Sequence, residues 1–217
     1  MNSTRTKIKI CGVTRPDDAA QVITAGVDFI GLNFWPRSKR YVAPDRALAI
    51  ATAARAAGAA QLVGVFVNAP PAEIAQVSRE LSLDVIQLHG DETPEDVVIV
   101  AQATRCPVWK AIAVGRPSDL DRLDAWPVDA ILVDAPTAAR GGAGKVFDWT
   151  LAREARRVYP ARRFVLAGGL GPKNVGAALV ELAPWAVDVA SGVESAPGVK
   201  DPAKVAAFVS IVRAHSA

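Results

Sequence analysis

Short runs of apolar, often β-branched residues alternate with alanine- and leucine-rich helical segments along the whole chain. Eight runs have the length and composition of strands, at residues 7–11, 28–34, 62–67, 84–89, 108–114, 130–134, 163–168 and 186–191. Helical patterns follow them near residues 16–25, 45–59, 71–82, 94–104, 117–124, 149–158, 172–182 and 201–214. Such alternation predicts parallel strands joined by helical crossovers.

Eight strand–helix units can close into a barrel, whereas an open doubly wound sheet usually has fewer strands. The strand runs are nearly continuously apolar, as expected when both faces of a strand are covered. The 217 residues are enough for such a barrel, and no linker or low-complexity segment divides them. We therefore expect an α/β fold, a (β/α)₈ TIM barrel, as a single domain over residues 1–217, with residues 1–6 as a flexible N-terminal segment.

Charge and cysteine content limit the class of function. The formal net charge of +3 is too small to indicate a nucleic-acid partner, and a small anionic ligand is a better use of a few local positive charges. No apolar stretch is long enough to span a membrane, and no secretory signal is visible. Cys11 and Cys106 do not make a disulfide framework, which favours a cytoplasmic location. We expect neither a nucleic-acid nor a membrane partner, and either a monomer or a homodimer.

Polar residues gather where the predicted strands end, which is where a barrel of this type carries its active site. They are Cys11, Asn33, Asn68, Gln87, His89, Lys110, Asp134 and Asp188. The alternation of side chains along each strand decides which of them face the barrel mouth. By position alone, Cys11 fits a small buried hydrophobe better than a catalyst, and Asp134 could be a turn residue. Cys106 lies at the start of a strand, at the opposite end, and we interpret it as structural.

Glycine-rich turns follow the last two predicted strands. They read "LAGGLGPKN" at residues 166–174 and "SGVESAPG" at residues 191–198, and the second could open a short extra helix. Glycine lets the backbone approach a phosphate closely, and barrels often bind phosphate after these two strands. The Walker A and G-x-G-x-x-G motifs are both incomplete. With only His89 and His215 as histidines, we expect no metal site.

Seven segments in chain order resemble a known family. They are "KICG" (9–12), "GLNFWPRSKRYV" (31–42), "VGVFVN" (63–68), "IQLHGDE" (86–92), "ILVDAPTAARGGAGKVFDW" (131–149), "LAGGLGPKNV" (166–175) and "VDVASGVESAPGVKD" (187–201). The chain resembles the phosphoribosylanthranilate isomerases of tryptophan biosynthesis over nearly all its length. This resemblance implies a (β/α)₈ barrel that needs no cofactor. It also implies an Amadori rearrangement of N-(5-phosphoribosyl)anthranilate to 1-(2-carboxyphenylamino)-1-deoxyribulose 5-phosphate by general acid–base catalysis.

The resemblance further implies roles for individual residues. The cysteine of "KICG", Cys11, is the expected general base, and the aspartate of "ILVD", Asp134, is the expected general acid. Arg40 is expected to pair with the anthranilate carboxylate. The phosphate is expected at the glycine-rich turns, at Gly168, Gly169, Ser191 and Gly192.

Two further residues are expected among those that bind substrate. His89, like Gln87, could contact the ligand, support a residue that does, or be a satisfied polar group of the core. Asp188 could line the pocket and bind the ribose hydroxyls, or it could orient the phosphate loop.

Two other functions remain open at the level of the sequence. One is the isomerase of histidine biosynthesis, or a dual-specificity relative. The histidine-pathway isomerase has a pair of aspartates as its acid and base, so Cys11 argues against it. The other is a barrel that binds a phosphorylated metabolite and has lost catalysis, against which Cys11, Asp134 and Arg40 argue. Activity with the anthranilate substrate discriminates all three.

Overall fold

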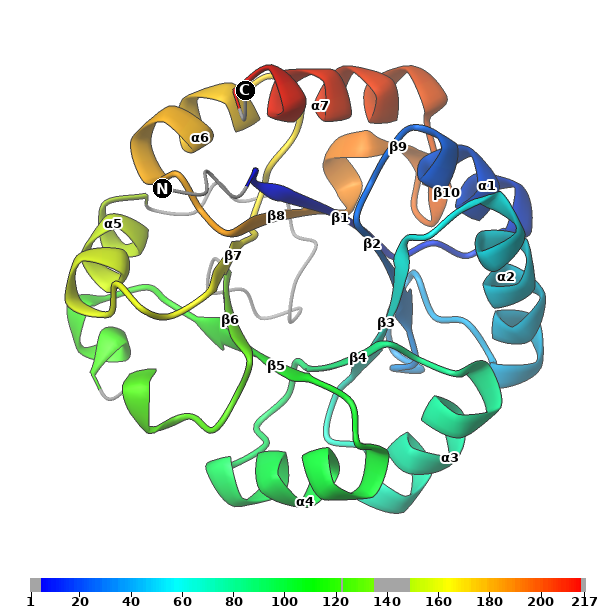
Figure 1. The fold of residues 1–217 in the computed structure, drawn as a ribbon, viewed down its shortest axis with the longest axis horizontal. Helices are drawn as coiled ribbons and strands as arrows, with labels where there is room; N and C mark the ends of the chain where they lie inside the picture. Colours follow the sequence, from blue (N-terminus) through cyan, green and yellow to red (C-terminus); the bar gives the residue numbers. More distant parts are fainter. Residues whose placement is uncertain (1–4, 122, 135–148, 216–217) are drawn as a thin grey trace.

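The computed structural model describes residues 5–121, 123–134 and 149–215. Within these residues, eight parallel strands form a closed barrel in chain order (Figure 1). The strands are β1 (Lys7–Cys11), β2 (Phe29–Asn33), β3 (Gln61–Phe66), β4 (Val85–Leu88), β5 (Val108–Ala113), β6 (Ala130–Asp134), β7 (Phe164–Leu166) and β8 (Ala186–Val189). The last strand, β8, pairs with β1 and closes the ring. The predicted (β/α)₈ barrel is confirmed.

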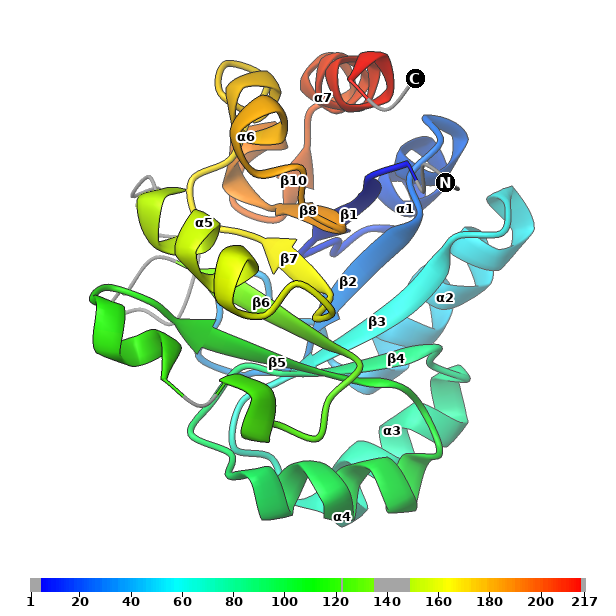
Figure 2. The same cartoon turned by 60° about the vertical axis from the view of Figure 1, so that its left-hand side comes forward.

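Helices surround the barrel on the outside (Figures 1 and 2). They are α1 (Pro16–Thr24), α2 (Pro44–Ala57), α3 (Pro71–Leu81), α4 (Pro94–Thr104), α5 (Trp149–Val158), α6 (Val175–Leu182) and α7 (Pro202–Ala214). Proline begins α1 to α4 and α7, where its missing N–H leaves no helical hydrogen bond unmade. At α4, Thr93 and Asp96 bond each other's backbone N–H groups in a capping box.

Two segments predicted as helices differ from the sequence prediction. Residues 117–124, predicted as one helix, instead contain the short 3₁₀ turns η1 (Pro117–Leu120) and η2 (Leu123–Ala125). The helix predicted from residue 172 begins at Val175, because Asn174 accepts a hydrogen bond from the Gly171 N–H and holds a turn there.

The segment after β8 contains a hairpin that the sequence prediction missed, after a short helical turn at the place where a short extra helix was considered. The 3₁₀ turn η3 (Ser191–Val193) is followed by a two-stranded hairpin, β9 (Glu194–Ala196) and β10 (Val199–Lys200). In Figure 1 this hairpin lies beside α1, outside the end of β1.

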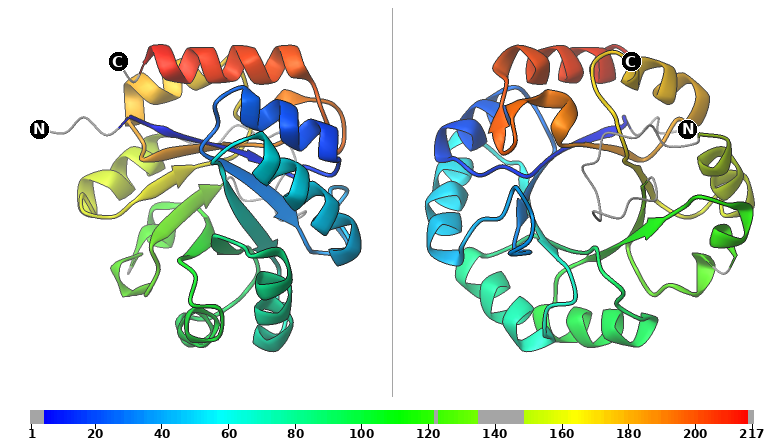
Figure 3. Two further views of the ribbon diagram at one scale, coloured as in Figure 1. Left: turned by 45° about the vertical axis from the view of Figure 1, so that its right-hand side comes forward. Right: turned by 180° about the vertical axis from the view of Figure 1, so that it is seen from behind.

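Side chains alternate between two separate apolar layers. Inside the barrel, residues such as Phe29, Val63, Trp109 and Leu132 form one buried cluster. The opposite strand faces pack against the surrounding helices in a second, larger cluster. Figure 3 shows from two further sides how these helices enclose the barrel. Because alternate residues of each strand face inward, polar side chains at the strand ends can meet above the interior cluster.

The first and last parts of the chain meet at the opposite end of the barrel. The Asp28 carboxylate accepts hydrogen bonds from the Ile8 N–H and from Arg213 of α7, both at 2.9 Å. Of the predicted flexible segment, residues 1–4 lie outside the described residues, while Arg5 donates to Asp28 at 2.9 Å. None of the helices in the described part of the chain is long and apolar enough to cross a membrane.

Candidate active site

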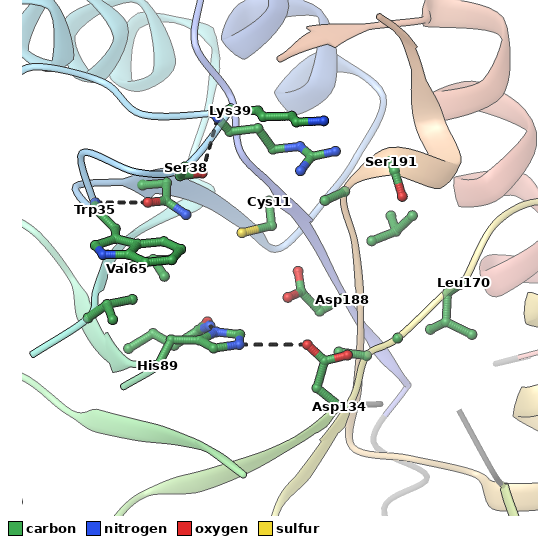
Figure 4. Close-up of a pocket in the computed structure, with 18 of the residues that line it drawn as sticks. Cys11, Trp35, Ser38, Lys39, Val65, His89, Asp134, Leu170, Asp188 and Ser191 are labelled. Carbon is green, nitrogen blue, oxygen red and sulfur yellow. Dashed lines mark hydrogen bonds and ion pairs between the residues drawn. The ribbon is translucent and has the colours of Figure 1, made fainter. Parts of the chain in front are cut away.

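A cavity of about 390 Å³ opens at the C-terminal ends of the barrel strands. The predicted site residues in its lining are Cys11, Arg40, His89, Asp134, Gly168, Gly169, Asp188 and Ser191. Figure 4 shows Cys11 and Asp134 approaching the cavity from different sides, with Asp188 between them. The structure therefore brings together groups that enter from β1, β4, β6, β7 and β8.

Cys11 ends β1 with its side chain on the inward face, two residues after Lys9. The Lys9 side chain is fully buried, and its ammonium donates to Oδ1 of Asp188 at 2.9 Å. Burial disfavours the ammonium, but Asp188 and Cys11 outweigh that effect and raise the pKa of Lys9. Burial also raises the pKa of the Cys11 thiol, while the charge of Lys9 acts in the opposite direction. A buried cation thus lies next to a thiol that favours its protonated form.

Asp134 ends β6 and lies close to a histidine that lines the same cavity. Nε2 of His89 lies 3.6 Å from Oδ2 of Asp134 (Figure 4). On the other side of the ring, Nδ1 of His89 lies 3.0 Å from the amide nitrogen of Gln87. Asp134 is 8% exposed and Gln87 is 1% exposed, so both are held largely away from bulk water. Gln87 therefore belongs to the site, as its place at a strand end suggested.

Arg40, in the loop after β2, is held from one side by Glu194 of the β9–β10 hairpin. Its Nε and Nη2 donate to the two Glu194 oxygens at 2.8 and 2.7 Å. Lys200, on the other strand of the hairpin, donates to Glu194 at 2.8 Å and to the Cys11 carbonyl at 2.6 Å. Burial opposes ionisation of Glu194, yet its bonds to Arg40 and Lys200 outweigh this and lower its pKa. One carboxylate thus links the Arg40 loop, the hairpin and the end of β1.

Sequence reasoning missed Glu194 and Lys200 as parts of the site. A signal for them exists in "ESAPGVK", residues 194–200. Opposite charges at the two ends of a short segment containing Pro-Gly are typical of a hairpin with a cross-strand ion pair.

The glycine-rich turns take up conformations that depend on glycine. Gly168 and Gly169 have φ of 87° and 68°, in the left-handed region, and both line the cavity. Gly192 lies behind Ser191, and a Cβ on it would lie 2.0 Å from the Leu170 carbonyl oxygen. The two turns can pack against each other only because residue 192 lacks a side chain.

Two polar residues at strand ends form a separate cluster and are not among those that line the cavity. Lys110 donates to Glu92 at 2.8 Å, and the Asn68 N–H donates to the same carboxylate at 2.8 Å. At the other end of the barrel, Cys106 contacts the Leu83 carbonyl at 3.2 Å, as expected for a structural cysteine. Most of the "ILVDAPTAARGGAGKVFDW" segment, residues 135–148, lies outside the described residues.

Known proteins resemble this chain over nearly its whole length. The family model for N-(5'-phosphoribosyl)anthranilate (PRA) isomerase matches residues 8–211. A Ralstonia nicotianae protein named N-(5'-phosphoribosyl)anthranilate isomerase is 43% identical over 218 residues, which cover 96% of this chain and 93% of that protein.

Solved structures agree with the sequence comparison. Phosphoribosyl anthranilate isomerase from Thermotoga maritima is 38% identical with a TM-score of 0.88, covering 96% of this chain and 99% of that one. A phosphoribosyl anthranilate isomerase in complex with reduced 1-(o-carboxyphenylamino)-1-deoxyribulose 5-phosphate is 36% identical with a TM-score of 0.84, at the same coverage of 96% and 99%. The chain belongs to the N-(5'-phosphoribosyl)anthranilate isomerase family.

Proposed function

We propose that this member of the isomerase family converts N-(5'-phosphoribosyl)anthranilate to 1-(2-carboxyphenylamino)-1-deoxyribulose 5-phosphate, with Cys11 as general base and Asp134 as general acid. The observation that carries the proposal is the meeting of a thiol from β1 and a carboxyl group from β6 in one cavity, beside the glycine turn after β7. The reaction needs two proton transfers at different positions of one substrate, and two groups on different sides of a cavity suit that need.

The steps follow from the chemistry of the substrate. Asp134 gives its proton to the furanose ring oxygen as the C1'–O bond breaks, and the lone pair of the anthranilate nitrogen forms the C=N bond of a protonated Schiff base. The Cys11 thiolate then takes the C2' proton, and the electrons of that C–H bond neutralise the iminium nitrogen to give an enolamine. Tautomerisation of the enolamine yields the ketone product.

The raised pKa of Cys11 has two opposite effects on its role as a base. It lowers the thiolate fraction at neutral pH below the few per cent of a free thiol, whose pKa is about 8.5. It also makes each thiolate a stronger base for a carbon-bound proton. The protonated Lys9 beside the thiol favours the thiolate when it forms. We therefore expect turnover to rise with pH through the neutral range.

Substrate binding is assigned to the groups around the two reacting centres. Arg40 has its Nε edge on Glu194, so its Nη1 and Nη2 edge is the one that would take the anthranilate carboxylate. The backbone of Gly168, Gly169 and Ser191 would hold the phosphate, with Gly192 allowing the two turns to pack. Asp188, oriented by Lys9, would accept hydrogen bonds from the ribose hydroxyls. His89 would act beside Asp134.

We also propose a cytoplasmic location, a single domain and either a monomer or a homodimer. Both cysteines are free, which is consistent with a cytoplasmic location and no structural disulfide. The barrel closes between its first and last strands, which supports a single domain. A Thermotoga maritima relative is described as a dimeric phosphoribosylanthranilate isomerase, and monomer and homodimer both remain compatible with this chain.

The decay of anthranilate-linked fluorescence tests the proposed activity. Freshly made phosphoribosylanthranilate is mixed with the purified protein, and the phosphoribosyl substrate of the histidine-biosynthesis isomerase is assayed beside it. We expect rapid turnover of the first substrate and none of the second. Turnover of both would indicate a dual-specificity enzyme, and turnover of neither would leave a binding barrel without catalysis.

A further inference from the structure

We propose that Gln87 is a positioning residue that holds His89 in its neutral Nε2–H tautomer, so that His89 presents a hydrogen-bond donor to Asp134. The catalytic consequence of this arrangement rests on the proposed function. The tautomer itself is a property of the ligand-free protein and can be measured without substrate.

The three side chains form a row along one wall of the cavity. Gln87 lies in β4 and is almost fully buried, and its amide nitrogen is 3.0 Å from Nδ1 of His89. On the other side of the ring, Nε2 lies 3.6 Å from Oδ2 of Asp134 at the end of β6 (Figure 4). The imidazole therefore lies between an amide and a carboxyl group, one at each ring nitrogen.

The hydrogen-bonding capacity of these groups decides where the proton of the imidazole lies. An amide NH₂ only donates, so Nδ1 must offer its lone pair to Gln87. A neutral imidazole carries one N–H, which is then on Nε2, facing an oxygen of Asp134 that can accept it. A proton on Nδ1 would place two donors opposite each other, the imidazole N–H and the Gln87 amide N–H.

The orientation of the Gln87 amide and the tautomer of His89 depend on each other. The amide oxygen, Oε1 of Gln87, is buried and has no hydrogen-bond partner among the residues that the structure describes. The opposite orientation of the amide would set its oxygen against Nδ1 and favour the Nδ1–H tautomer, so the tautomer reports which way the amide points.

A donor at this position matters when Asp134 gives up its proton. The carboxylate that forms is stabilised by a hydrogen bond donated to it, and Nε2–H of His89 needs to close only a small gap to make one. Gln87 does not touch Asp134 and acts through His89. Its loss should therefore lower kcat more than it changes KM.

Nitrogen-15 NMR of the ligand-free protein tests the tautomer directly. The chain has two histidines, so His215→Gln identifies the His89 signals by removing the others. We expect Nδ1 to give the signal of an unprotonated nitrogen and Nε2 that of a protonated one. In Gln87→Glu, a carboxylate faces Nδ1, and we expect Nδ1 to become protonated. An Nδ1–H tautomer in the wild type would overturn the proposal.

Kinetics with matched variants test the consequence for catalysis. Gln87→Leu removes the amide at similar size, and we expect kcat to fall about tenfold, the equivalent of one hydrogen bond, with KM within about twofold. His89→Gln can place an amide nitrogen near the position of Nε2, whereas His89→Asn reaches only the position of Nδ1. We therefore expect His89→Gln to keep more of the wild-type kcat.

The NMR and kinetic measurements together distinguish a failure of the positioning role of Gln87 from a failure of the proposed isomerase activity. Unchanged kcat in Gln87→Leu, or equal losses in the two His89 variants, would contradict the positioning role even if the tautomer is as expected. A wild type that does not turn over phosphoribosylanthranilate would overturn the proposed function alone, and NMR would still decide the tautomer.

Discussion

At the scale of single residues, the surroundings of Cys11 set the pH dependence of the site. Burial raises the pKa of its thiol, the ammonium of Lys9 opposes the rise, and Asp188 adds to it. Because the net direction is upward, the thiol is the resting form at neutral pH. The fraction of thiolate, and with it the rate of any step that uses it as a base, must grow as the pH rises.

Alkylation by iodoacetamide measures this ionisation. In a Cys106→Ser background, where Cys11 is the remaining cysteine, we expect the alkylation rate to rise with pH and its midpoint to lie above about 8.5, the ordinary value for a thiol. A midpoint below that value would mean that Lys9 dominates over burial, and the account of Cys11 as a mostly protonated base would be wrong.

At the scale of elements, the β9–β10 hairpin is a brace for the substrate-binding arginine. Glu194 binds Arg40 and Lys200 at once, and Lys200 also reaches the Cys11 carbonyl. The hairpin thus fixes the loop after β2 relative to the end of β1. Its effect on catalysis should come through the orientation of the Arg40 guanidinium.

Glu194→Gln tests the brace. The amide keeps the size of the side chain but loses the charge that holds both cations, so we expect KM for phosphoribosylanthranilate to rise about tenfold, with a smaller effect on kcat. Glu181→Gln is the matched control, because Glu181 pairs with Arg153 on the surface and such exposed pairs contribute little. Equal KM values for the wild type and Glu194→Gln would contradict the brace.

The elements of the barrel could be predicted because the hydrophobic periodicity and the helix-capping and turn residues indicate the same boundaries along the chain. β1, β6 and α4 have the predicted bounds, since apolar runs, Pro94 and the Thr93 cap all point to them. Residues 117–124 were predicted wrongly as one helix. Asp119 accepts from the Gly115 and Arg116 N–H groups, and this local hydrogen bonding favours a short turn.

The candidate site was only partly predictable, for a physical reason. Strand ends indicated Cys11, Gln87, His89 and Asp134, since the barrel rule depends on position along the chain. The same rule also selected Lys110, which instead pairs with Glu92 outside the cavity. The contacts of Glu194 with Arg40 join residues far apart in the sequence, so no local pattern could show them.

At the scale of the whole molecule, Asp28 connects β1 and the segment before it to the last helix, α7, at the end of the barrel opposite the cavity. It receives hydrogen bonds from Arg5, from the Ile8 N–H and from Arg213 of α7. Burial disfavours its charge, but the bonds to Arg213 and Ile8 outweigh this and lower the pKa of Asp28. A carboxylate with a lowered pKa stabilises the fold above its unfolded pKa of about 3.9, and that stabilisation is lost as the pH falls through the lower folded value.

Asp28→Asn should therefore destabilise the protein in a pH-dependent way. We expect the free energy of unfolding at pH 7 to fall by about 1–2 kcal/mol, allowing for solvent screening of the exposed arginine. The gap to the wild type should narrow as the pH drops below about 4, where the wild-type carboxylate is neutralised. Urea unfolding at pH 7 and below pH 4 measures it, with Asp45→Asn as control, because Asp45 is exposed on the surface of α2. A gap that does not change with pH would show that charge is not the cause.

Cys11 and Asp134 are the two proposed proton-transfer groups of the site. Their roles are tested most directly by the fluorescence-decay assay with Cys11→Ser, Asp134→Asn and the control Cys106→Ser beside the wild type. We predict that each of the first two variants loses about 10²- to 10⁴-fold in kcat while Cys106→Ser stays near the wild type. Turnover that survives Cys11→Ser or Asp134→Asn at near the wild-type rate would contradict the assignment of base or acid, respectively.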